Sequence, residues 1–155
     1  LILGRISRSL LHTTRLGSTA KTAVSSPKQS LFLTHAAADL SRPILLIYDG
    51  SESAEEALSV AVHLGGQNGR YNILISADGN QQAQLLKEHL DRFFQTFAIK
   101  GSFRRLHQIN LEEIQHILHM TQSGILILSH DNTQLTPSLT RKLLETIDCP
   151  ILLIK

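Results

Sequence analysis

Glycine and hydroxyl residues near the start of the chain form the clearest pattern with chemical potential. Gly4 is separated by two residues from Ser7, which is followed after nine residues by Gly17, Ser18 and Thr19. Glycines let backbone N–H groups approach an anion closely, and a helix that begins at small hydroxyl residues adds its positive end. This chemistry suits an anionic group, so the loop from Gly4 to Thr19 is a candidate anion-binding loop.

The charge around this loop supports an anionic ligand. Residues 1–38 contain five basic residues and no acid, whereas residues 39–155 contain ten basic and thirteen acidic residues. The formal net charge of +2 therefore comes from the first segment alone. Arg5 and Arg8 lie inside the loop, where they can contact phosphate or simply remain solvated.

A second candidate is Asp49, in the turn Asp49-Gly50-Ser51 that follows an apolar run. Its carboxylate can contact a ligand, and it can equally cap the turn into the next helix. The loop from Ser129 to Thr136 occupies the place that corresponds to the first loop, but it contains Asp131 and no glycine. We therefore expect no backbone phosphate nest there.

Other residue patterns in the sequence give weaker indications of function. His116 and His119 share a helix face, but no third metal ligand has a predictable position, and we expect no metal. The sequence has no Gly-Lys-Ser/Thr phosphate loop, no Gly-x-Ser-x-Gly elbow and no cysteine–histidine nucleophile, so we expect no enzyme activity. Few aromatic residues and an acidic balance beyond residue 39 argue against nucleic-acid binding.

The elements that position these residues alternate regularly from residue 43 onward. Apolar runs of strand length alternate with segments of helical period, which predicts five strands and four helices in a parallel, doubly wound α/β sheet. The first helix is expected to begin with a capping box at Ser53 and Glu56. Strands are expected at 43–48, 71–75, 101–107, 124–129 and 151–154, and helical stripes at 57–64, 86–97, 111–118 and 139–147.

The first 38 residues repeat the end of this pattern. Leu1 to Leu3 parallels Ile125 to Leu128, residues 16–24 have a helical pattern, and Leu31 to Leu33 follows a proline as Ile151 to Ile154 does. We interpret residues 1–38 as the strand–loop–helix–strand end of an earlier copy, 39–42 as a linker and 43–155 as a complete second copy. An acid-free stretch rich in Arg, Ser and Leu is also typical of a mitochondrial transit peptide, and that alternative stays open.

The strands, turns and loops described above resemble those of the universal stress protein family. The run from Ile44 through Asp49 to Ser51 is similar to that family's first strand and acidic turn, and Asp148 to Ile154 is similar to its closing strand. The family's phosphate motif reads Gly, two residues, Gly, nine residues, Gly, then Ser or Thr. Residues 4–18 keep this spacing, with Ser7 in place of the second glycine.

The resemblance implies an adenine-nucleotide alpha-hydrolase-like fold with the five strands in the order 3-2-1-4-5. It also implies ATP or a related adenine nucleotide as ligand, with Gly4, Arg5, Ser7, Gly17, Ser18, Thr19 and Asp49 as nucleotide-binding residues. The last strands of the two copies are expected to pair, as a pseudo-dimer within the chain or by self-association.

Two functions follow as hypotheses. The first is a cytoplasmic, nucleotide-binding stress-response protein in which the second copy is degenerate. The second is a non-catalytic dimerisation or regulatory module, possibly the cytoplasmic tail of a larger transporter or sensor. No apolar run has the roughly 20 residues of a membrane span, and the single cysteine, Cys149, suits a reducing compartment.

Overall fold

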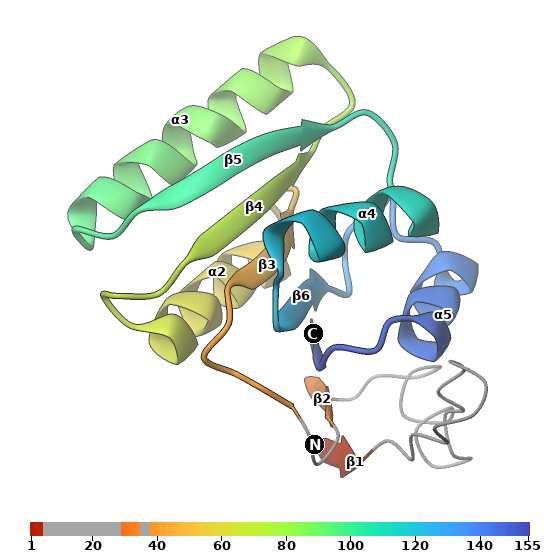
Figure 1. Cartoon of the computed structure of the whole chain (residues 1–155). Helices are drawn as coiled ribbons and strands as arrows, with labels where there is room; N and C mark the ends of the chain where they lie inside the picture. Colours follow the sequence, from red (N-terminus) through yellow and green to blue (C-terminus); the bar gives the residue numbers. More distant parts are fainter. Residues whose placement is uncertain (5–28, 35–37) are drawn as a thin grey trace.

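A computed structural model of the chain describes residues 1–4, 29–34 and 38–155 (Figure 1). Its central feature is one sheet with the strand order β1-β2-β7-β6-β3-β4-β5. The predicted residues Arg5, Ser7, Gly17, Ser18 and Thr19, and the helical pattern at 16–24, lie outside the described residues. The strands are β1 (Ile2–Gly4), β2 (Leu31–Thr34), β3 (Ile44–Tyr48), β4 (Tyr71–Ser76), β5 (Gly101–Leu106), β6 (Ile125–Ser129) and β7 (Ile151–Ile154).

The five strands of residues 43–155 are all parallel to one another, and the predicted α/β fold and its order 3-2-1-4-5 are confirmed. The sheet as a whole has seven strands where five were expected for one copy, because β1 and β2 continue it. β2 lies antiparallel to β7, and β1 lies parallel to β2. The strands at 31–33 and 151–154 are therefore neighbours in one continuous sheet.

Burial follows the apolar runs in the sequence. Every residue of β3 and β6 is buried, because these strands lie at the centre of the sheet with helices on both faces. β5 is an edge strand, in which Arg104 is exposed and Arg105 is half-buried.

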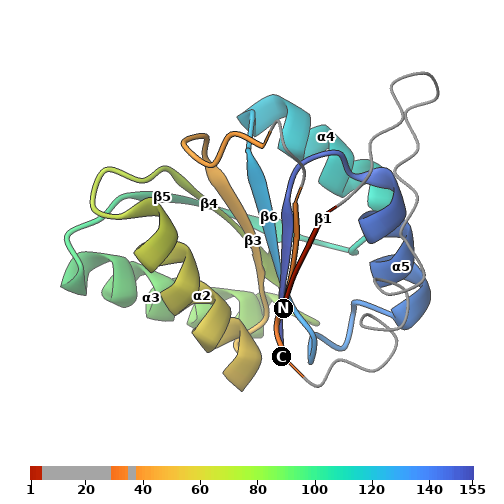
Figure 2. The same cartoon turned by 90° about the horizontal axis from the view of Figure 1, so that it is seen from below.

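The helices are α2 (Glu52–Gly65), α3 (Asn80–Thr96), α4 (Leu111–Thr121) and α5 (Pro137–Thr146). Figure 2 shows α2 and α3 on one face of the sheet and α4 and α5 on the other. Two hydrophobic cores result, one on each face. In the described part of the chain, none of these helices is long and apolar enough to cross a membrane.

Three helix starts show how side chains fix these boundaries. Asn110 and Thr136 cap α4 and α5 by accepting hydrogen bonds from Glu113 N and Leu139 N. The expected capping box at Ser53 is wrong. The N-cap of α2 is Ser51, whose Oγ accepts from Ala54 N at 3.2 Å, so the helix begins two residues earlier.

Candidate functional site

The carboxyl ends of β3, β4 and β6 form the candidate site of residues 43–155. In a doubly wound sheet, ligands bind where the chain order reverses at the carboxyl edge. Here the reversal is at β3, because the strands that follow it in the chain add first on the β4 side and then on the β6 side. The turns that leave these strands carry the residues that decide what this edge can do.

Asp49 follows β3 and shapes the turn into α2. Its Oδ1 accepts hydrogen bonds from the backbone N of Ser51 at 3.0 Å and from Ser51 Oγ at 2.7 Å. Between them, Gly50 has a φ of 81°, in the left-handed region that favours glycine. The structure thus shows Asp49 in the structural role that the sequence left open for it, since it holds the serine that caps α2.

The loop between β6 and α5 folds back over the same edge. Asn132 is buried, and its Oδ1 accepts from Gln134 N at 3.0 Å, which turns the chain. Gln134 Nε2 then donates to Asp78 Oδ1 in the loop after β4, at 3.0 Å. Because β3 lies between β4 and β6 in the sheet, this hydrogen bond links the loops on either side of the carboxyl end of β3.

Three buried polar side-chain atoms at this end of the sheet have no hydrogen-bond partner among the described residues. They are Ser76 Oγ at the end of β4, Ser129 Oγ at the end of β6 and Asn132 Nδ2 in the following loop. Buried polar groups are normally paired, and an unpaired one costs on the order of 1–3 kcal/mol. In the sequence, each of these two serines ends an apolar run, which is the pattern that could have identified them. The sequence analysis did not predict them as site residues.

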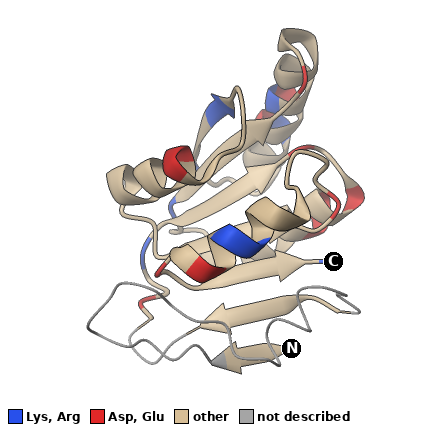
Figure 3. Ribbon diagram, turned by 90° about the vertical axis from the view of Figure 1, so that its right-hand side faces the viewer, with Lys and Arg blue, Asp and Glu red and all other residues tan. Residues whose placement is uncertain are grey.

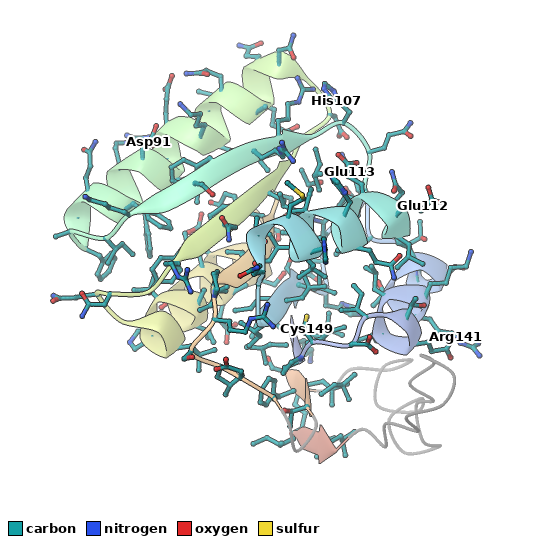
Figure 4. The ribbon with its side chains drawn as sticks, viewed as in Figure 1. Asp91, His107, Glu112, Glu113, Arg141 and Cys149 are labelled. Carbon is teal, nitrogen blue, oxygen red and sulfur yellow. The ribbon has the colours of Figure 1, made fainter. Side chains whose placement is uncertain are left out.

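A cleft of about 760 Å³ lies beside this loop at the N-terminus of α5. Its described lining includes Asp131, whose side chain is 61% exposed, and Arg141, which pairs with Glu145 at 3.1 Å. Arg141 points away from the sheet (Figure 4). Asp131 lies 3.4 Å from His130 and Arg141 is paired with an acid, so the described lining of this cleft carries no unpaired Lys or Arg for a phosphate. Over the described ribbon, the Lys and Arg positions are spread over several elements and not gathered at this edge (Figure 3).

A polar cluster under the first turn of α2 involves Tyr48, Glu55 and His89. The Tyr48 hydroxyl donates to Glu55 Oε1, and His89 Nε2 lies 3.0 Å from the same oxygen. The His89 ring stacks parallel to Tyr48, with centroids 6.3 Å apart. Burial and the hydrogen bond to Glu55 raise the pKa of Tyr48 well above its usual range. The cluster joins α2 and α3 to the end of β3, and its role is structural.

We expect Tyr48→Phe to lower the free energy of unfolding by about 1 kcal/mol at pH 7, because Glu55 loses its buried donor. The raised pKa fixes the sign of the pH dependence. Protonated Tyr48 stabilises the fold fully below its ordinary pKa of 10.0, and this contribution is lost as the pH rises through the folded-state value. Urea unfolding between pH 7 and 11 should show a shallower alkaline loss in the variant. Identical slopes for both proteins would contradict this assignment.

Gly4 and Asp49 are the two predicted nucleotide-binding residues within the described part of the chain, and they do not lie together. Gly4 ends β1 beside Thr34, and β1 and β2 run opposite to the other strands. The carboxyl end of β1 therefore lies at the opposite end of the strands from Asp49. Gly4 and Asp49 thus lie at opposite ends of the strands. Within the described residues, no group of three His, Cys, Asp or Glu could hold a metal ion, and this includes His116 and His119.

This architecture also occurs in proteins of known structure. No protein-family model matches the sequence, and no curated protein matches it. A solved universal stress protein from Archaeoglobus fulgidus DSM 4304 aligns over 99% of the chain, with a TM-score of 0.78 and 17% identity. The chain has the universal stress protein fold. It covers 61% of the length of that archaeal protein.

Two shorter structures align with about three quarters of the chain. One is from the universal stress protein family of Burkholderia pseudomallei, with a TM-score of 0.58 and 16% identity over 75% of this chain and 97% of that one. The other is a universal stress protein in complex with cAMP, with a TM-score of 0.58 and 14% identity over 74% of this chain and 96% of that one. The universal stress protein fold thus occurs both in chains shorter than this one and in longer chains.

Proposed function

We propose that this protein is a non-catalytic, nucleotide-binding protein of the stress response, with ATP or a related adenine nucleotide as its ligand. The observation that carries the proposal is the shared fold with a universal stress protein that binds cAMP, an adenine nucleotide. The loop from Gly4 to Thr19 is the binding element, with Gly4, Arg5, Ser7, Gly17, Ser18 and Thr19 as its contacts. We further propose that the protein acts in the cytoplasm.

The carboxyl ends of the strands in the second copy support this choice of loop, because their residues are poorly suited to bind phosphate. A hydrogen bond between Gln134 and Asp78 links the loops that flank the carboxyl end of β3, and Asp49 accepts hydrogen bonds from Ser51. The loop after β6 carries Asp131 where a phosphate would need a cation. A nucleotide phosphate has no comparable obstacle in the acid-free segment before residue 39. The second copy is therefore proposed to be degenerate.

The test compares the two loops directly. Nucleotide that copurifies with the full-length protein should be detected by mass spectrometry, and its affinity measured by calorimetry. Gly17→Val should weaken binding about tenfold or more, since a branched side chain would stand where backbone amides face phosphate, at a cost of about 1–3 kcal/mol. Asp131→Asn is the control and should leave affinity nearly unchanged. The reverse result would show that the site is wrongly assigned.

A second candidate is a non-catalytic dimerisation or regulatory module, either free-standing or as the cytoplasmic tail of a larger transporter or sensor. The continuous sheet across β2 and β7 favours it, because that junction links the two copies without any ligand. Absence of copurified nucleotide, together with unchanged stability on nucleotide addition, would favour this function over the first.

A further inference from the structure

Strand β5 forms one open edge of the sheet. Among the described residues it pairs with β4 alone, and Figure 1 shows it at the margin of the sheet that lies farthest from β1. The pairing with β4 runs without interruption over the whole of β5. Within the described part of the chain, the outer side of β5 therefore leaves a regular row of backbone N–H and C=O groups unpaired, and another extended chain can add to such a row.

The side chains along this edge are basic. Residues 92–111 contain four Lys or Arg residues and no acid. Lys100 and Arg104 are exposed, and neither forms an ion pair with a described carboxylate. Arg105 donates to Asn80 Oδ1, while its buried Nε has no partner among the described residues. The unpaired charge along β5 is therefore positive.

A groove of about 540 Å³ extends this basic surface at the amino ends of β4 and β5. Its described lining includes Arg70 and Lys100, and the other residues in that lining are uncharged. An acidic side chain can therefore enter the groove without meeting a carboxylate in its described lining.

The two faces of β5 differ in chemistry. Phe103 packs edge-on against Phe94 of α3, with ring centroids 5.3 Å apart, and Arg105 donates to the first residue of the same helix. Because side chains alternate along a strand, Ser102 and Arg104 lie on the other face, where both are exposed. A strand added beside β5 would place one set of its side chains next to Phe103 and the alternate set next to Arg104.

Charged side chains on an edge strand commonly protect a protein against aggregation. On β5 these charges are all of one sign, so two copies of the strand repel each other, whereas an acidic strand is attracted. Other protections of an edge are a proline or a bulge, and β5 contains neither. The edge thus disfavours pairing with its own copy and favours a segment of opposite charge.

We propose that β5 binds an extended segment of a partner protein in which acidic and apolar residues alternate. Main-chain hydrogen bonds to the open edge align the segment, and its acids lie beside Lys100 and Arg104. Its apolar residues lie on the opposite face, beside Phe103. A nucleic acid fits this edge less well, because its phosphates can meet the arginines but its backbone cannot continue the sheet.

Peptide binding to the 155-residue chain tests the proposal. The probe is a short fluorescent peptide of alternating Glu and Val, and fluorescence anisotropy in low-salt buffer should show saturable binding. Arg104→Glu should weaken this binding at least about tenfold, because it places a like charge beside the acids of the peptide. Lys142→Glu is the matched control and should leave the affinity nearly unchanged. It makes the same change of charge at an exposed position on α5, which lies far from β5 in Figures 1 and 2.

Amide hydrogen exchange separates strand addition from simple charge attraction. Every second amide of β5 points away from β4, so these amides should exchange rapidly in the free chain. A saturating amount of the alternating peptide should slow their exchange at least about tenfold, since each amide then donates to the added strand. Bound peptide with unchanged exchange at β5 would overturn the proposal.

Two comparisons of ligands can also overturn it. A peptide with the same Glu and Val residues in two separate blocks should bind much more weakly, since it cannot place acids on one face and apolar side chains on the other. Equal affinity for both peptides, or equally tight binding of a single-stranded DNA, would show a general polyanion surface instead. β5 and β1 are the outermost strands on opposite sides of the sheet, so the proposal can fail while the nucleotide function of the loop after β1 stands.

Discussion

A chain shortened to residues 39–155 is expected to self-associate. Removing β1 and β2 turns β7 into an edge strand whose four residues, Ile151 to Ile154, are all apolar and carry no charge. It also takes Leu31 and Leu33, each 1% exposed, out of the core that they share with β7. Unpaired backbone groups beside newly exposed apolar side chains favour pairing between two copies of the edge.

Light scattering after size-exclusion chromatography should show dimers or larger species of the shortened chain, with a fraction that rises with concentration. Leu152→Lys in the shortened chain supplies the control. Leu152 is partly buried opposite Phe32, so in the absence of β2 a lysine there would place a charge on the new edge and should restore the monomer. A shortened chain that is a well-behaved monomer without this change would contradict the structural importance of the β2–β7 pairing.

The main elements of the fold were predictable because burial dominates their sequences. The runs at 44–48 and 125–129 are apolar at nearly every position, as strands covered on both faces must be. Their parallel arrangement follows from the helices between them. The order of the strands required the resemblance to a known fold, since several orders satisfy the same apolar pattern.

Local boundaries were harder because neighbouring residues compete for the same role. Ser51 and Ser53 are both good helix caps, and the sequence reasoning chose Ser53. Ser51 is the N-cap because Asp49 accepts hydrogen bonds from the Ser51 backbone N and hydroxyl, and these bonds hold Ser51 at the turn. Phe97 was expected with Phe93 and Phe94 on a buried face. It lies instead at the end of α3 and is 47% exposed, although its ring contacts Phe93.

The candidate site could be predicted only in outline. Asp49 and the glycine-free loop after β6 were visible in the sequence, because turn residues follow recognisable strands. The hydrogen bond between Asp78 and Gln134 was not, since the two residues are 56 positions apart and meet only through the sheet order. The separation of Gly4 from Asp49 likewise depends on the antiparallel junction of β2 with β7.

Two glycine-to-serine substitutions should have opposite effects on stability, and the contrast tests the packing of the linker before β3. Gly124 begins the approach to β6, and its backbone N donates to Pro43 O at 2.8 Å. A Cβ at this position would lie 2.4 Å from the backbone oxygen of Asp39 and 2.5 Å from Arg42 Cβ. Neither atom is the end of a flexible side chain, so the backbone itself must move.

We expect Gly124→Ser to lower the free energy of unfolding by about 2 kcal/mol, which for a chain of this size is a fall in Tm of roughly 4–8 °C. Gly79→Ser adds the same atoms at the N-cap of α3, where a Cβ meets nothing within 4 Å. Its hydroxyl can cap a helix that has no side-chain cap, so it should be neutral or stabilising by a few tenths of a kcal/mol. Thermal and urea unfolding of both variants provide the measurement. Equal stability of the two would mean that residues 39–42 do not lie against Gly124 in solution.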